Sequence, residues 1–125
     1  MSVTELPHSP TSECLRVNQV IGRIGDKWSV LVIVLLQQKP HRFSELKRGI
    51  GSISQRMLTL TLRGLERDGL VDRTVTPSVP PRVDYELTEL GRSLAEPVKA
   101  LGSWGFQHLD QIAGAQARYD AKSTS

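Results

Sequence analysis

The chain is poor in cysteine and histidine, which restricts the metal and disulfide chemistry open to it. Cys14 is its only cysteine, so an intrachain disulfide framework and a zinc site built from clustered cysteines are both excluded. The three histidines, His8, His41 and His108, are far apart and show no metal-ligand spacing. The sequence therefore predicts no metal site and no bound cofactor.

Aromatic residues and long apolar runs are also scarce. Aromatics make up 5% of the chain, too few to predict a surface of stacking rings for single-stranded nucleic acid. The longest apolar run, Val30 to Leu36, is far below the roughly 20 residues that span a bilayer, and the opening MSVTELPHSP has no apolar segment typical of a secretory signal. We expect a cytoplasmic protein without a membrane partner.

Recognisable catalytic motifs are absent as well. The sequence shows no Ser-His-Asp set, nucleophile elbow, phosphate-binding loop or carboxylate pair. We therefore expect a protein that is not an enzyme.

Positive charge is concentrated in the middle of the chain. Residues 39–82 hold nine Lys and Arg against four Asp and Glu, a net of +5, so the remainder carries −2 of the overall +3. A basic middle between acidic flanks is typical of a polyanion-binding surface. Charge alone predicts an ordinary solvated surface equally well.

The chain length predicts a single domain, which we place at residues 12–121 after a flexible arm at 1–11. The segment from Cys14 to Ile24 has apolar residues at helical spacing. Asp26 is a good N-cap for the next segment, 27–38. The β-branched residues of this segment also suit a strand, but its length between Asp and Lys-Pro favours a buried helix.

The stretch GSISQRMLTLTLRGLERDGL, residues 51–70, can be read as a strand or as a helix. Its centre alternates apolar and polar residues, yet on a helical wheel the polar residues of 53–67 fall within one arc. Ser52 with Gln55 forms a capping box, and Gly69 supplies the stop, so we predict a helix buried over most of its circumference. The outward arc holds Gln55, Thr59, Arg56, Arg63, Glu66 and Arg67.

The preceding segment completes a helix-turn-helix. Residues 43–48 form a short helix closed by Gly49, so the motif spans about 43–68. Gln and Arg are the side chains that pair with adenine and guanine edges in the DNA major groove. Ser44 and Lys47, on the first helix, are expected to touch phosphate.

Two alternating segments follow and predict a hairpin at about 70–87. Leu70 to Thr76 and Arg82 to Leu87 are the strands, and the proline-rich residues between them form a stiff tip. Arg73 and Arg82 are expected to give the hairpin a basic edge that lies on phosphate or in the minor groove. A helix-turn-helix followed by such a hairpin is a winged helix.

The last part of the chain, about 88–121, is expected to be helical. Thr88 caps a helix from Glu89 to Glu96, and Pro97 forces a break or a new start. The first and last helices are not needed for a winged core, and we expect them to form a homodimer interface rather than to pack within one chain. The expected interface residues are Val17, Val20, Ile21, Leu101, Trp104, Leu109 and Ile112. The fold class is mainly α with a small β-hairpin: a winged helix-turn-helix with extra N- and C-terminal dimerisation helices.

Four segments together resemble a known family. IGDKWSVLVI, RFSELKRGIGSISQRMLTLTLRGLERDGLVDRTV, PPRVDYELTELGRSL and LGSWG are similar to the HxlR-type winged-helix transcriptional regulators, whose architecture is related to that of the MarR regulators. The resemblance implies a homodimer that binds a palindromic double-stranded DNA operator in bacterial promoters and dimerises through its terminal helices. By position it places Ser54, Gln55, Arg56, Thr59 and Arg63 on the recognition helix, and Arg73 and Arg82 at the wing.

The resemblance also gives Cys14 a regulatory role. Many members of the family carry a Cys-Pro near the start of the first helix, and in some the cysteine senses oxidants, quinones or aldehydes. Cys14 matches that cysteine, but Leu15 replaces the proline. A small buried thiol with no sensing role is the alternative reading.

A rival function class is a winged helix that binds only proteins. Such a module would need neither the outward Gln, Thr and Arg residues nor the basic middle of the chain. We expect the steep salt dependence of DNA binding to separate the two functions.

Overall fold

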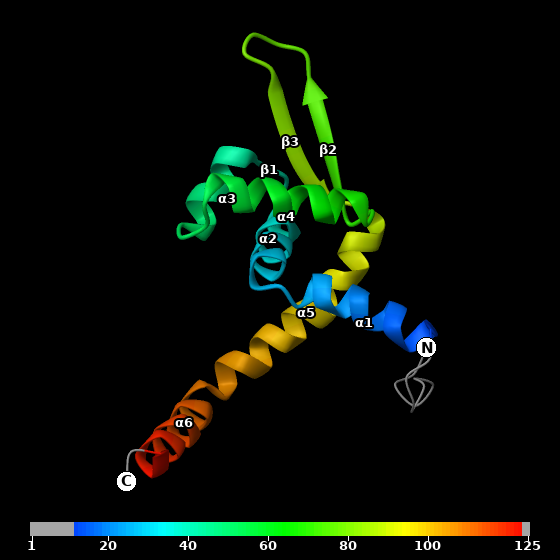
Figure 1. The fold of residues 1–125 in the computed structure, drawn as a ribbon. Coiled ribbons are helices and arrows are strands. Elements are labelled where there is room, and N and C mark those ends of the chain that lie inside the picture. Colours follow the sequence, from blue (N-terminus) through cyan, green and yellow to red (C-terminus); the bar gives the residue numbers. More distant parts are fainter. Residues whose placement is uncertain (1–11, 124–125) are drawn as a thin grey trace.

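The structure, a computed structural model, describes residues 12–123, which form six helices and three short strands (Figure 1). The flexible arm expected at 1–11 lies outside the described residues. A compact body holds α2 to α4 and the start of α5, with a hairpin at one end and a long helical extension at the other (Figure 1). The elements are α1 (Ser12–Ile24), α2 (Lys27–Gln38), β1 (His41–Arg42), α3 (Phe43–Ile50), α4 (Gln55–Arg67), β2 (Val71–Thr76), β3 (Arg82–Leu87), α5 (Glu89–Gln107) and α6 (Leu109–Ser123).

The segment read as either strand or buried helix is the helix α2. Asp26 caps it, with the carboxylate Oδ2 accepting a hydrogen bond from the Ser29 backbone amide at 3.4 Å. Val32 and Ile33 are fully buried, because α2 runs through the middle of the body. The core around it is made of Leu36, Leu46, Ile53, Leu58, Leu62, Leu65, Leu70, Val71, Leu87, Ala95 and Val98.

The predicted helix at 53–67 is confirmed, but its start is two residues later. Ser54 is the N-cap, and its Oγ accepts a hydrogen bond from the Met57 backbone amide at 3.0 Å, so the capping box expected at Ser52 is wrong. The helix begins later than predicted because Ile53 packs into the core, where it is 1% exposed. Gly69 ends the helix as predicted, with a φ of 77° that favours glycine.

Helix α3 extends past Gly49, where the sequence predicted its end. Gly51 makes the turn, with a φ of 78°, and its amide bonds to the Lys47 carbonyl at 2.9 Å. Gly49 has another role, since a Cβ there would lie 2.9 Å from Cδ1 of Leu35 on α2. The glycine that looks like a stop therefore allows two helices to approach each other.

The predicted hairpin is confirmed as β2 and β3, and the sequence missed β1. The antiparallel sheet has the order β1-β3-β2, with His41 opposite Tyr85 and Val71 opposite Leu87. Two residues are too few to show a strand period in the sequence. Thr88 ties the base of the sheet to the end of α4, because its hydroxyl donates to the Gly69 carbonyl at 2.6 Å.

Pro97 does not interrupt the helix, although the sequence predicted a break there. It lies inside α5, on an exposed side, between the buried residues Ala95 and Val98. A proline inside a helix costs one hydrogen bond and adds a steric clash, and core packing on both sides offsets this cost. The break comes at His108, whose ring Nδ1 lies 2.7 Å from the Trp104 carbonyl and whose ring stacks on the indole.

Candidate nucleic-acid interface

Helix α4 presents a polar strip away from the core. Gln55, Arg56 and Arg63 are exposed and Thr59 is half-buried, all on one side of the helix. The opposite side is held by the buried residues Leu58, Thr61, Leu62 and Leu65.

Two of the predicted contact residues, Thr59 in α4 and its N-cap Ser54, already make hydrogen bonds to the backbone of the helix. The Thr59 hydroxyl donates to the Gln55 carbonyl at 2.9 Å, so its methyl group and oxygen lone pairs remain available for a ligand. Ser54 accepts the Met57 amide through its oxygen, which leaves its hydroxyl proton free to donate. Ser54 is therefore a helix cap and not part of the helical strip.

The apolar side of α4 is less buried than the sequence predicted. Met57 is 39% exposed and Leu60 is 47% exposed. Both line a hollow of about 380 Å³ between α4 and α1, together with Gln19 and Arg23. The helical wheel showed that these side chains share the apolar side, but not that the core ends before reaching them.

Helix α3 places its predicted phosphate contacts beside α4. Ser44 is exposed in the first turn of α3 and Lys47 is half-buried one turn later. The Arg42 backbone amide donates a hydrogen bond to Glu45 Oε1 at 2.8 Å. This hydrogen bond is the main reason that the pKa of the Glu45 carboxyl lies below its ordinary value. This hydrogen bond fixes the first turn of α3, and with it the position of Ser44.

The wing, which we define as β2, β3 and the tip at residues 77–81, does not have the basic edge that the sequence predicted. Arg73 stands opposite Tyr85, whereas Arg82 stands opposite Thr76. Because side chains alternate across a strand, the two arginines lie on opposite faces of the hairpin. Arg82 is also paired with Asp84, with Nε and Oδ2 3.0 Å apart.

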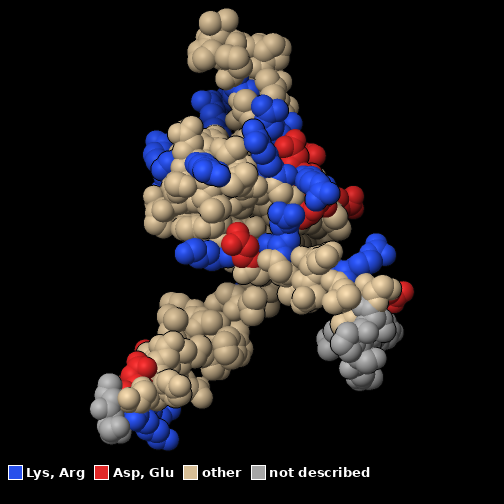
Figure 2. Space-filling model, viewed as in Figure 1, with Lys and Arg blue, Asp and Glu red and all other residues tan. Residues whose placement is uncertain are grey.

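Lysine and arginine side chains gather over the winged-helix body. Figure 2 shows them around α3, α4 and the base of the wing, while the wing tip and most of the α5–α6 extension carry few charges. The net charge of +5 in residues 39–82 is therefore spread over one end of the molecule. This electrostatic pattern is that expected of a surface that binds a polyanion.

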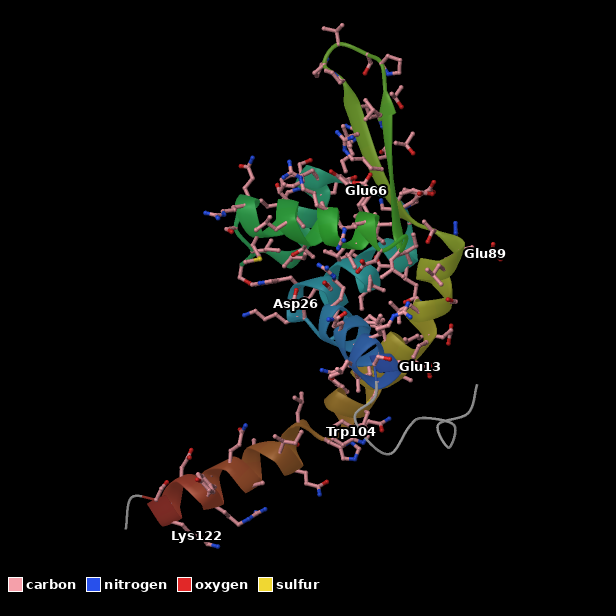
Figure 3. All side chains as sticks on the ribbon, turned by 45° about the vertical axis from the view of Figure 1, so that its right-hand side comes forward. Glu13, Asp26, Glu66, Glu89, Trp104 and Lys122 are labelled. Atoms are coloured by element: carbon pink, nitrogen blue, oxygen red, sulfur yellow. The ribbon has the colours of Figure 1, made fainter. Side chains whose placement is uncertain are left out.

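The terminal helices α1 and α6 leave most of their apolar residues uncovered, although Ile24 at the end of α1 packs against the core. Neither α1 nor α6 contains a buried residue. Figure 3 places Trp104 near the junction of α5 and α6, well away from α4 and the wing. Every residue expected at a dimer interface is substantially exposed: Val17 (39%), Val20 (57%), Ile21 (56%), Leu101 (65%), Trp104 (53%), Leu109 (59%) and Ile112 (40%).

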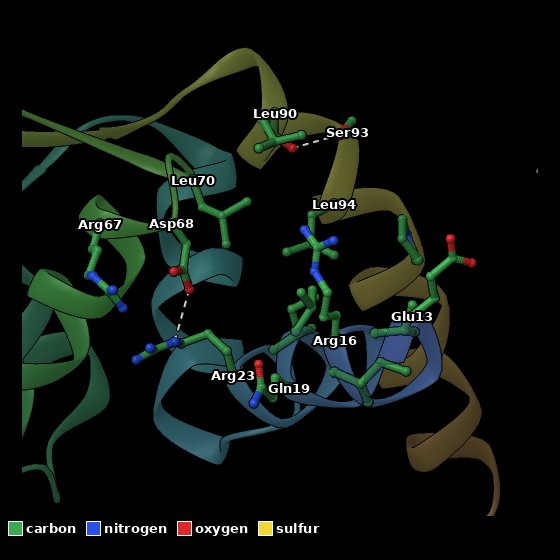
Figure 4. Close-up of a pocket in the computed structure, with 15 residues that line it drawn as sticks. Glu13, Arg16, Gln19, Arg23, Arg67, Asp68, Leu70, Leu90, Ser93 and Leu94 are labelled. Atoms are coloured by element: carbon green, nitrogen blue, oxygen red, sulfur yellow. Dashed lines mark hydrogen bonds and ion pairs between the residues drawn. The ribbon is translucent and has the colours of Figure 1, made fainter. Parts of the chain in front are cut away.

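Cys14 is half-buried on α1. Other residues of α1 line a groove between α1, the end of α4 and the first half of α5 (Figure 4). The groove has a volume of about 1000 Å³. Arg23 reaches across the groove to Asp68, an ion pair that the sequence did not predict because the residues are 45 positions apart and show no shared pattern.

Within residues 12–123, no helix has the length and apolar character needed to cross a bilayer.

Comparisons with known proteins agree on one family. A profile described as HxlR-like helix-turn-helix matches residues 23–113. The chain is 44% identical over 94 residues to the uncharacterized HTH-type transcriptional regulator YtfH of Escherichia coli K12, covering 75% of each chain. It is also similar to the structure of the redox regulator HypR in its reduced form, with a TM-score of 0.75, 41% identity, and 79% and 98% of the two chains covered. The diamide-treated YodB from B. subtilis gives a TM-score of 0.67 at 34% identity, covering 78% of this chain and 96% of that one. The fold, the family profile and these relatives together show that the chain belongs to the HxlR-like helix-turn-helix family of transcriptional regulators.

Proposed function

We propose that this regulator binds a palindromic DNA operator as a homodimer, with α4 in the major groove. The observation that carries the proposal is the polar strip on α4, backed on the opposite side by the buried residues Leu58, Leu62 and Leu65. A helix held in this way keeps Gln55, Arg56 and Arg63 in a fixed orientation. Glutamine pairs with adenine and arginine with guanine at their major-groove edges.

The remaining polar residues position the protein on the DNA backbone. Ser44 and Lys47 from α3, and Ser54 at the start of α4, lie at the ends of the two motif helices, where phosphates flank the major groove. Arg73 and Arg82 extend the contact along the wing. These contacts fix the register, while the α4 strip reads the sequence.

A homodimer accounts for the uncovered terminal helices. Neither α1 nor α6 contains a fully buried residue in one chain, so a second copy would cover the apolar side chains that both helices leave exposed. Two-fold symmetry would then place two α4 helices about 34 Å apart, one turn of the duplex. We also propose a cytoplasmic location, because an operator-binding protein needs access to the genome.

Cys14 is proposed as a redox-sensitive regulatory residue. Its thiol sits on α1, the helix proposed to join the two copies, so a change in its covalent state would alter the dimer. The similarity to HypR, which is described as a redox regulator, supports this role.

The test is a footprint on the DNA upstream of this protein's own gene, combined with a salt titration. We expect protection of two half-sites and a fall in log affinity of roughly 0.9 per neutralised phosphate for each unit of log salt. Arg56→Ala or Arg63→Ala should cost about 1–3 kcal/mol on the operator and less on unrelated DNA. A flat salt dependence with no footprint would instead favour a winged helix that binds only proteins.

A further inference from the structure

The tip of the wing is apolar, in contrast to the charged body below it. Residues 77–81 have the sequence PSVPP, without a charged side chain, and Val79 is fully exposed. Figure 2 shows the end of the hairpin free of Lys, Arg, Asp and Glu. The nearest charge along β3, Arg82, is paired with Asp84 at 3.0 Å.

The tip also has few groups that can donate hydrogen bonds. Three of its five residues are prolines, which have no backbone N–H. The Ser78 hydroxyl donates to the Pro80 carbonyl at 2.7 Å, so its proton is used within the tip. The minor-groove edges of A·T pairs offer only acceptors, so reading them by hydrogen bonds requires donors. The tip is poorly equipped for that kind of reading.

The length of the hairpin matches the spacing of DNA grooves. Val71 is buried in the core and Thr76 is the last residue of β2, five positions further out. At about 3.4 Å per residue the outer end of β2, where the tip begins, stands roughly 17 Å beyond the core. This distance is about half of the roughly 34 Å helical turn, the separation between a major groove and the next minor groove. With α4 in the major groove, the tip would reach the flanking minor groove.

We propose that the wing tip reads the flanking minor groove by shape, with Val79 as the contact that selects against base pairs carrying the guanine 2-amino group. This inference rests on the proposed DNA binding by α4. Guanine alone places an amino group in the minor groove, where it narrows the space above the groove floor. An apolar side chain that fills this space gains contact over A·T pairs and meets the amino group over G·C pairs.

The experiment changes only the minor-groove edge of the operator. The footprint first identifies the outermost minor groove at each end of the protected region. Replacing an A·T pair there by G·C should weaken binding roughly fivefold or more. Replacing it by inosine·cytosine, which lacks the 2-amino group, should restore affinity, and 2,6-diaminopurine·thymine, which adds the amino group, should weaken it again.

Variants show whether Val79 is responsible. Val79→Gly should bind A·T and G·C flanks with similar affinity, whereas Arg63→Ala should bind more weakly overall and keep the discrimination. If inosine behaves like guanine, or if Val79→Gly discriminates as the native protein does, the tip inference is wrong although DNA binding stands. If no footprint forms at all, the proposed function itself fails.

Discussion

The guanidinium of Arg23 on α1 pairs with the carboxylate of Asp68, the C-cap residue of α4, with 2.9 Å between Nε and Oδ2 (Figure 4). Helix α1 has no fully buried residue. The ion pair therefore adds a specific polar contact between α1 and the proposed recognition helix α4. The two side chains are 40% and 31% exposed, which limits their contribution to stability.

We expect Arg23→Gln and Asp68→Asn each to lower the free energy of unfolding by less than about 1 kcal/mol. The double variant should lose little more than either single variant, because each change removes the same interaction. Urea unfolding of all four proteins at low and high salt measures this coupling. A coupling energy that does not shrink in salt would contradict an exposed ion pair.

Two helical glycines should respond differently to alanine. A Cβ at Gly91 would run into the backbone carbonyl of Leu70, and backbone cannot move aside at low cost. A Cβ at Gly64 would meet the end of the Arg23 side chain, which can rotate away. We expect Gly91→Ala to destabilise by about 1–3 kcal/mol or more.

Gly64→Ala should be close to neutral, because the gain in helix propensity of about 1 kcal/mol offsets the disturbed ion pair. Thermal unfolding of both variants, with Gly22→Ala on open surface as the control, tests this order. Equal losses at Gly64 and Gly91 would show that Arg23 cannot move.

Local signals predicted much of the fold. Asp26, Gly69 and Thr88 mark helix ends in the structure as they did in the sequence, because capping and left-handed turns depend only on neighbouring residues. The α4 strip was also predictable, since residues on one side of a helix follow from spacing alone.

Features that depend on the rest of the molecule could not be predicted. Pro97 stays inside α5 because residues on either side of it in the chain pack into the core. Helix α4 begins after Ile53 because that side chain is buried in the core. The separation of Arg73 and Arg82 onto two faces depends on the register of β2 and β3, which the lengths of the strands alone do not determine.

A charge at Trp104 should separate the proposed dimer. The indole is 53% exposed in one chain, and burying a glutamate against a second copy is costly. We expect Trp104→Glu to sediment as a monomer at concentrations where the native protein is dimeric, and to bind the operator more weakly. Val79→Glu, which also charges an exposed apolar residue but at the wing tip, should stay dimeric. A dimeric Trp104→Glu would place the interface elsewhere.

The two wing arginines should differ in their contribution to DNA affinity. Asp84 neutralises Arg82, whereas Arg73 stands opposite Tyr85 on the other face. We expect Arg73→Ala to reduce the slope of log affinity against log salt by about 0.9, and Arg82→Ala to reduce it by less. Asp84→Asn should strengthen binding, because it removes a carboxylate near phosphate and releases Arg82. Weaker binding by Asp84→Asn would mean that the ion pair holds Arg82 in its DNA contact.

Oxidation of Cys14 should weaken operator binding. Diamide accepts two hydrogens from two thiols as they form a disulfide, and because each chain has one cysteine, the partner thiol must come from a second copy or a small thiol. Either product adds bulk or a covalent constraint to α1, which Arg23 links to the end of α4. We expect the operator affinity of the native protein to fall with diamide dose and to recover with dithiothreitol. Cys14→Ser should bind the operator with unchanged affinity at every dose, and a mutant that loses affinity in parallel with the native protein would rule out Cys14 as the sensor.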